Sequence, residues 1–228
     1  MTRSGWDRTP KLPLARSLLR YLTRVFAVWM KDKDPKELLL SIQSVVKNRN
    51  GSVLARQLIL KSDHFDTGIE SRLDFGLQGA PNFRMADLNI FGVAQPTHSG
   101  ILTILNLMHS TMDQQRVYWF CTREEPLIYI NRKPFVLRDI HSPYENIKTY
   151  HGISAYRLEA MEDRLKLDIK KELSKWNNLL LVHEEIDQGK IVPMWTAVTD
   201  LQTTKELFQE MNQQGKYGLL LGLTTSSP

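Results

Sequence analysis

Short apolar segments alternate with segments of helical periodicity along most of this 228-residue chain, and this alternation constrains the fold most. Runs rich in aliphatic and aromatic residues predict strands at 52–60, 88–93, 117–121, 179–182, 190–198 and 217–221, and a hairpin joining 127–130 to 135–137. Apolar residues at helical spacing predict helices at 14–30, 34–46, 99–112, 154–176 and 199–213. Strands that alternate with helices favour an α/β fold, with a mostly parallel sheet flanked by helices.

The segment 154–176 has the clearest helical pattern in the chain. One apolar stripe is formed by Leu158, Met161, Leu165, Ile169, Leu173 and Trp176. Glu162 and Lys166 are four residues apart, and we expect them to pair on the exposed side of this helix. Thr199-x-x-Gln202 is a capping-box pattern that predicts the start of the last helix, and residues 63–86 are expected to form a long loop.

Positive charge is concentrated near the beginning of the chain. The net charge is +5, and the residues before position 62 include 13 Lys and Arg against 4 Asp and Glu. We expect a basic helical extension at 1–44, a folded domain at 45–222 and a flexible tail at 223–228. The extension could contact phosphate or anionic lipid or act as a targeting segment, but a solvated helix face is the simpler interpretation. Aromatic residues are not interleaved with the basic ones, so there is no strong nucleic-acid signal.

Composition excludes several classes of protein. No run approaches the ~18 apolar residues of a membrane span. The single cysteine excludes an intrachain disulfide framework and fits a reducing compartment, so we expect a cytoplasmic protein. The six histidines show no H-x-x-x-H or H-E-x-x-H spacing, so neither a metal site nor a cofactor is predicted.

Several strings that occur in a fixed order resemble a known family. They are VVKNRNGSVL (45–54), KSDHF (61–65), GAPNFR (79–84), FGVAQPTHSG (91–100), REEPLIYINRKPFVLRD (123–139) and GISAYRLEAMEDRLKLDI (152–169). Together they resemble a paladin-like repeat of the protein-tyrosine-phosphatase-like inositol polyphosphate phosphatases, or cysteine phytases. The resemblance covers roughly residues 45–215.

The resemblance implies a cysteine-dependent phosphatase fold, whose catalytic loop has the form C-x-x-G-x-G-R-[ST]. The chain contains no C-x5-R, because the position six residues after its only cysteine, Cys121, is Leu127. We therefore expect an incomplete domain without a catalytic loop and assign no catalytic residue, and whether the protein is an enzyme stays open. The alternative is a non-catalytic regulatory or interaction module. Its ligand would be an inositol polyphosphate or a phosphoprotein, and a further repeat or partner would cover the final strand.

Two arginines are the candidate phosphate contacts. Arg84 in APNFR resembles the arginine that faces the inositol phosphate in phytases, and Arg123 occupies the arginine position of the family's strand-end motif. A guanidinium group suits phosphate oxygens because of its fixed geometry and permanent charge. The simpler interpretation is an ion pair: Arg84 with Asp87, and Arg123 with Glu124, Glu125 or another acid.

Other residues of the family strings have simpler structural interpretations. Gln95 and Thr97 are expected to serve loop and helix-start structure. Cys121 ends an apolar strand and is expected to be a buried thiol without reactivity. Asp63 beside His64 could suggest acid–base chemistry, but a structural or surface role is the simpler explanation.

Overall fold

The computed structural model describes residues 42–63, 76–86, 88–111, 116–187, 189–213 and 219–223. All of them belong to one compact unit, residues 42–228. The expected basic extension before residue 42 and the tail after residue 223 lie outside the described residues. Residues 42–47 are helical, in agreement with the end of the helix predicted over 34–46.

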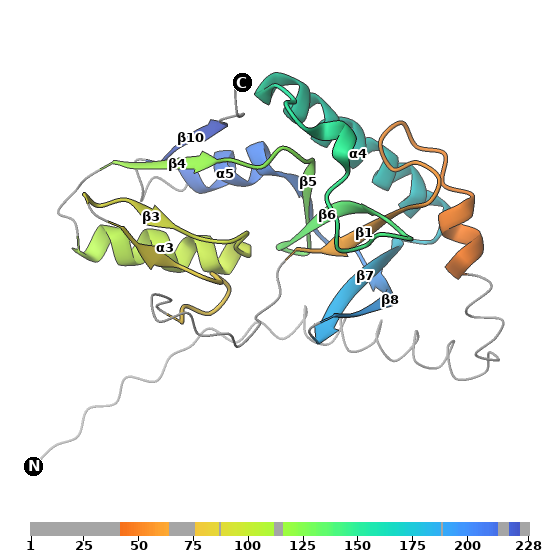
Figure 1. Cartoon of the computed structure of the whole chain (residues 1–228), viewed down its shortest axis with the longest axis horizontal. Helices are drawn as coiled ribbons and strands as arrows, with labels where there is room; N and C mark the ends of the chain where they lie inside the picture. The colour runs from red at the N-terminus through yellow and green to blue at the C-terminus, as the bar shows by residue number, and fades with distance from the viewer. Residues whose placement is uncertain are drawn as a thin grey trace, which may run out of the picture. The chain divides into compact units, whose positions relative to one another are not determined.

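A six-stranded mixed sheet forms the centre of the described unit (Figure 1). Its order is β8 (Lys190–Ala197), β7 (Leu179–Asp187), β1 (Leu58–Ser62), β6 (Lys133–Asp139), β5 (Leu127–Ile130) and β9 (Leu201–Thr203). The α/β class with helices flanking the sheet is confirmed.

The expectation of a mostly parallel sheet needs correction. Within the six strands, only β1 and β7 pair in parallel, and the other four pairings are antiparallel. The reason is that β5–β6 and β7–β8 are hairpins, and a tight turn can connect only antiparallel strands. The turns use positive φ angles at Asn131, Arg132 and Gly189.

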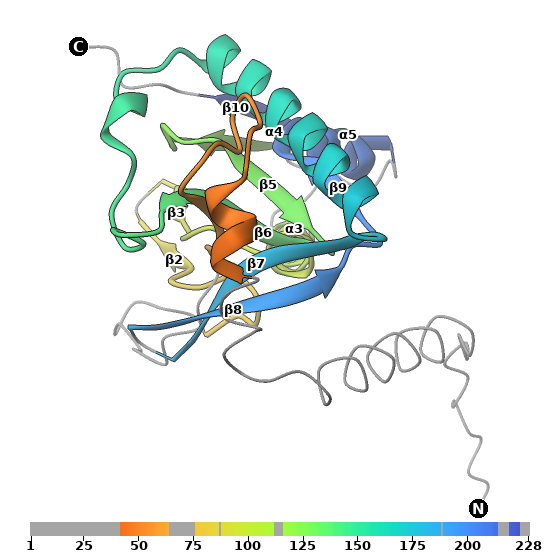
Figure 2. The same ribbon diagram turned by 90° about the vertical axis from the view of Figure 1, so that its right-hand side faces the viewer.

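Helices cover both faces of the sheet (Figure 2). The side chains of β5 divide between these two faces. Ile128 and Ile130 pack in the cluster that contains the apolar residues of α4 (Ala155–Lys175). Leu127 and Tyr129 pack on the opposite side with α3 (His98–Thr111) and α5 (Thr204–Gln213). All four side chains are at most 2% exposed, as expected for a strand buried on both faces.

The long helix α4 is confirmed, but its buried face carries acids as well as the apolar stripe. The expected Glu162–Lys166 pair is wrong. Glu162 is buried and accepts hydrogen bonds from the backbone N–H of Leu127 at 3.1 Å and of Thr204 at 3.2 Å. Lys166 instead pairs with Glu206 of α5.

The strand expected at 52–60 begins only at Leu58 and runs to Ser62. Val53 and Leu54 are buried, but their N–H groups donate to the carboxylate of Asp168 on α4, at 2.7 and 3.1 Å. These backbone donors are satisfied by a side chain rather than by a neighbouring strand, so residues 53 and 54 form a turn.

Two other element boundaries also differ from the predictions. The strand expected at 88–93 is reduced to β3 (Phe91–Gly92), which pairs with β2 (Arg84–Met85), because Leu88 and Asn89 have positive φ angles and form the turn between them. The last helix starts at Thr204 rather than near Thr199. Its capping box is Thr203 with Glu206: Thr203 N–H donates to the Glu206 carboxylate at 2.9 Å, and Glu206 N–H donates to Thr203 Oγ1 at 3.3 Å.

A separate two-stranded sheet pairs β4 (Val117–Cys121) with β10 (Leu219–Leu223), and this pair is parallel. The register matches Val117 with Leu219 and Cys121 with Leu223. Both strands were expected, and β4 has the predicted bounds. Because the strands run in the same direction, their carboxyl ends lie at the same edge.

Candidate functional site

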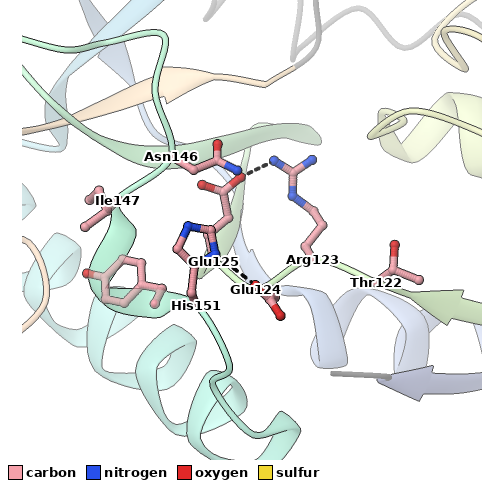
Figure 3. A pocket seen from close by; sticks show the side chains of 8 residues that line it. Thr122, Arg123, Glu124, Glu125, Asn146, Ile147 and His151 are labelled. Carbon is pink, nitrogen blue, oxygen red and sulfur yellow. Dashed lines mark hydrogen bonds and ion pairs between the residues drawn. The ribbon is translucent and has the colours of Figure 1, made fainter. Parts of the chain in front are cut away.

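A pocket of about 370 Å³ opens where the chain leaves β4 (Figure 3). Two segments line it, one between β4 and β5 and the other just before α4. The lining residues are Thr122, Arg123, Glu124, Glu125, Asn146, Ile147, Tyr150 and His151.

Local structure holds both segments in place. The first begins directly after Cys121 and ends at β5, whose first N–H group, at Leu127, is bound by Glu162. The second contains the short 3₁₀ helix η1 (Lys148–Tyr150) and leads to Ser154, whose hydroxyl accepts a hydrogen bond from Arg157 N–H at the start of α4.

Arg123 is held by two carboxylates at the pocket. Its Nη1 lies 2.6 Å from Oδ2 of Asp63, and its Nη2 pairs with Glu125. A second arginine, Arg138 on β6, binds both carboxylate oxygens of Glu125: Nη1 donates to Oε2, and Nη2 donates to Oε1 at 3.2 Å. Arg138 Nη1 also donates to the carbonyl of Leu137 at 2.8 Å. The two arginines and two acids thus form a charge-balanced cluster.

Burial shapes the electrostatics of this cluster. The side chains of Glu125 and Arg138 are 6% and 7% exposed, whereas that of Arg123 is 25% exposed. Burial raises the pKa of Asp63, and although Arg123 counters this effect the pKa stays above its ordinary value. Burial alone would lower the pKa of Arg123, but Asp63 and Glu125 outweigh it and raise that pKa, so the guanidinium keeps its charge.

The hydrogen bonding of the Asp63–Arg123 pair is incomplete. Asp63 Oδ2 is close enough to Arg123 Nη1 for an ion pair, but it receives no well-aligned hydrogen bond in the described part of the chain. Arg123 Nε is likewise buried with no acceptor among the described residues. Buried polar atoms are normally satisfied, so this part of the cluster has capacity for a further polar contact.

The opposite side of the pocket carries a histidine and a tyrosine. His151 Nδ1 lies 3.1 Å from Oε2 of Glu124, and the imidazole is largely exposed (Figure 3). Burial raises the pKa of Tyr150, and the nearby Glu125 raises it further, so its phenol stays protonated. The pocket therefore offers a cation, carboxylates and neutral donors, without a surplus of positive charge.

The structure does not bring the two candidate arginines together in this pocket. Arg84 lies on β2 and is not among the lining residues. Its Nη1 donates to the carbonyl of Asn82 at 3.0 Å, and its guanidinium lies over Gly92, where an added Cβ would approach Cζ to 3.1 Å. The alternative partner Asp87 lies outside the described residues. For Arg123, the expected ion pair with Glu125 is present.

Cys121 has the properties of an unreactive thiol. It is partly buried at the end of β4, and burial raises its pKa, although the backbone N–H of Arg123 acts in the opposite direction. A protonated thiol is a poor nucleophile. Leu127, six residues later, is a buried residue of β5.

The structural roles expected for Gln95 and Thr97 are present. Gln95 Nε2 donates to the hydroxyl of Tyr129 at 2.8 Å, and that hydroxyl donates to the carbonyl of Pro96 at 3.1 Å. Thr97 Oγ1 accepts from Gly100 N–H at 3.1 Å and so caps the start of α3. His64 lies outside the described residues, so its proposed acid–base partnership with Asp63 stays a prediction.

The described residues contain no group of three or more His, Cys, Asp or Glu side chains arranged to hold a metal ion. None of their helices is both long and apolar enough to cross a membrane.

Part of the chain is similar to known proteins. Residues 120–217 match the family of PTP-like phytases, described as "Inositol hexakisphosphate". Paladin from Danio rerio is 26% identical over 140 residues, which cover 58% of this chain and 16% of that protein. The resemblance expected from the sequence is thus confirmed: part of the chain matches the PTP-like phytase family, and the chain is similar to paladin.

Two solved structures from Mitsuokella multacida also resemble the chain, each with 16% identity. The PTP-like myo-inositol phosphatase in complex with myo-inositol-(1,3,4,5)-tetrakisphosphate gives a TM-score of 0.47 over 74% of this chain. The tandemly repeated protein tyrosine phosphatase like phytase gives 0.44 over 75%. This chain spans 28% of each of those two chains and a still smaller share of paladin.

Sequence reasoning identified Arg123 and its partner Glu125 but missed Asp63 and Arg138. Asp63 is far from Arg123 in sequence, and neither Asp63 nor Arg138 belongs to a recognisable catalytic motif. A signal for Arg138 did exist. The β5–β6 register pairs Leu127 with Val136, and extending it by two residues places Glu125 opposite Arg138.

Proposed function

We propose that this chain is a phosphatase-family domain that binds a phosphate group of an inositol polyphosphate at Arg123 and does not hydrolyse it. The observation that carries this proposal is the position of the pocket. Every lining residue falls within the segment that matches the PTP-like phytase family, and the pocket lies where β4 ends beside its parallel neighbour β10.

The side chains that line the pocket favour binding of a single phosphate group over binding of several phosphate groups at once. Arg123 supplies a permanent positive charge, and His151 and Asn146 supply further hydrogen-bonding groups. The volume of about 370 Å³ falls within the ~300–1,000 Å³ range of ligand pockets. Glu124 and Glu125 would repel additional phosphates, so the remaining phosphates of a polyphosphate would face solvent.

The sequence supports binding without turnover. Cysteine-dependent phosphatases form a covalent intermediate on a thiolate that is stabilised by a nearby arginine and backbone N–H groups. The chain has one cysteine and no C-x5-R. The raised pKa of Cys121 further disfavours a thiolate.

Calorimetric titration with inositol hexakisphosphate at low salt tests the binding. We expect a saturable heat that weakens as salt is added, because the contact is ionic. Arg123→Gln is expected to weaken binding by about 10-fold or more, since it removes a charge-assisted contact. Arg164→Gln, on the exposed face of α4, is the matched control and should leave the affinity unchanged. Arg84→Gln shows whether the second candidate arginine takes part.

A phosphate-release assay on the same protein tests the absence of turnover. No phosphate should be released from inositol hexakisphosphate. Release that disappears in Cys121→Ser would contradict this part of the proposal, and absence of any saturable heat in the calorimeter would contradict the binding part.

A second candidate function is an interaction module, and the surface of β4 favours it. Tyr118 and Phe120 are 60% and 61% exposed, whereas their neighbours Val117 and Trp119 pack towards α3 and α5. An exposed apolar strand face favours contact with another protein surface. We propose that a further phosphatase-like repeat covers it.

A further inference from the structure

We propose that Asp63 is an internal competitor for the anion site, so that a ligand phosphate binds Arg123 by displacing the Asp63 carboxylate. This inference rests on the proposed function, because it identifies what limits and regulates phosphate binding at that site. Asp63 comes from the end of β1 and does not line the pocket, so it would determine affinity by competing for Arg123 without touching the ligand.

The two carboxylates on Arg123 are held unequally. Glu125 is bound from two sides, by Arg123 and by the nearly buried Arg138. Asp63 Oδ2 has only the ion pair to Arg123 Nη1, at 2.6 Å and without a well-aligned hydrogen bond. Of the two carboxylates, that of Asp63 is therefore displaced from Arg123 more readily.

A phosphate can replace what Asp63 supplies. The carboxylate compensates the charge of Arg123 but leaves Arg123 Nε without an acceptor. A phosphate group carries more charge and more acceptor oxygens than a carboxylate, so it can compensate the same guanidinium and bind further donors. The cost of the exchange is that Asp63 is left buried next to a new anion.

Protonation of Asp63 would remove that cost. The charged groups that face it are Arg123 after β4, Glu125 before β5, Arg138 on β6 and Lys61 on β1. Burial is the largest influence and raises the Asp63 pKa; Arg123 lowers it, and Glu125 raises it again. A bound phosphate would neutralise Arg123 and add negative charge, both of which raise this pKa further.

The sign of the pH dependence follows from linkage. The complex holds the Asp63 proton more tightly than the free protein does, so proton binding and anion binding support each other. Affinity should therefore rise as pH falls towards the raised pKa of Asp63. An anion whose own charge does not change with pH should therefore bind more tightly at lower pH than at higher pH.

The direct test replaces Asp63 and measures inositol hexakisphosphate binding by calorimetry at neutral pH and low salt. Asp63→Asn should tighten binding by at least about 5-fold, the size expected for removing one partly screened ion pair. Asp163→Asn, on the exposed face of α4, makes the same change of charge and controls for general electrostatics. It should change the affinity much less.

A second measurement begins with the unsubstituted chain. Inositol hexasulfate keeps a constant charge across the pH range, so its binding reports only the protonation of the protein. Its affinity for the unsubstituted chain should increase as pH falls, and for Asp63→Asn this increase should be reduced. A thermal melt of each variant confirms that the titrated protein is folded.

The outcomes separate this inference from the proposed function. If the unsubstituted chain binds, but Asp63→Asn binds no more tightly than Asp163→Asn, Asp63 is not a competitor and the proposed function stands. If the hexasulfate affinity of the unsubstituted chain does not change with pH, the inference fails even when Asp63→Asn cannot be folded. If neither protein binds either ligand, the proposed function fails, and this inference fails with it.

Discussion

At the scale of single residues, the ion pair between Glu125 and Arg138 supports the pocket from within the protein. Both side chains are almost completely buried, and Arg138 does not line the pocket. A buried charge is tolerated only while its partner is present. These two residues therefore hold the pocket-lining loop and Arg123 in place.

Arg138→Met should destabilise the protein by about 3 kcal/mol, because it leaves Glu125 buried with one partner fewer. Urea unfolding followed by circular dichroism measures the change. Lys205→Met is the control, since it breaks an ion pair between the partly exposed side chains of Lys205 and Glu159 and should have little effect. Combining Arg138→Met with Glu125→Leu should recover part of the loss. Additive losses in the double variant would show that the two side chains are not coupled.

At the scale of elements, Glu162 joins three parts of the fold. It lies on α4, and its carboxylate accepts hydrogen bonds from the start of β5 and from the backbone and hydroxyl of Thr204 at the start of α5. Burial raises its pKa to about 7, although these hydrogen bonds counter part of the rise. The carboxyl that connects the elements therefore changes its charge near neutral pH.

The stability of the protein should depend on this proton. The folded pKa is above the unfolded one, so the unfolded chain loses the proton at lower pH than the folded protein does. The free energy of unfolding should fall as pH rises from about 4.5 to about 7, by as much as ~3 kcal/mol, and then level off. Glu162→Gln should remove this decline in denaturant unfolding measured at several pH values.

Glu159→Gln is the matched control for that experiment. Glu159 lies on the same helix and pairs with Lys205 near the surface, so its substitution should preserve the decline. Parallel stability curves for Glu162→Gln and the unsubstituted protein would contradict the assignment of the pH dependence to Glu162.

At the scale of the whole described unit, sequence patterns predicted the layers well because those patterns are local. The aromatic and β-branched run of β4 and the apolar stripe of α4 each lie within one segment, and both elements form where expected. Long-range polar contacts were not predictable in this way. Asp168 accepts hydrogen bonds from the N–H groups of Val53 and Leu54, which are about 115 residues earlier in the chain. Because of these contacts, Val53 and Leu54 do not form the strand that was expected there.

In the candidate site, too, local residues could be predicted from the sequence and long-range contacts could not. Arg123 could be identified from its position after a strand, and its pairing with Glu125 was an expected alternative. Asp63 could not be assigned to it, because only the folded sheet brings the end of β1 close to the loop after β4. The hairpin register could have revealed Arg138, since Glu125 and Arg138 are both within the string 123–139.

The surface of β4 leads to a prediction about assembly. If Tyr118 and Phe120 form a contact surface, the chain should associate with itself at high concentration when its natural partner surface is missing. In sedimentation velocity, the sedimentation coefficient of the unsubstituted chain should increase with protein concentration. Replacing both residues with Thr, which is compatible with a strand, should abolish this increase without unfolding the protein. A protein that stays monomeric at its highest soluble concentration would contradict this role.

The parallel pairing of β4 with β10 also has a consequence for biosynthesis. Val117 and its partner Leu219 are about one hundred residues apart, so the ribosome completes β4 long before β10 exists. At ~5–20 residues per second, the edge of β4 that receives β10 waits roughly 5–20 s for it during translation. A strand edge exposed for that long can pair with another chain. The nascent protein should therefore depend on chaperones most strongly in the interval between synthesis of these two strands.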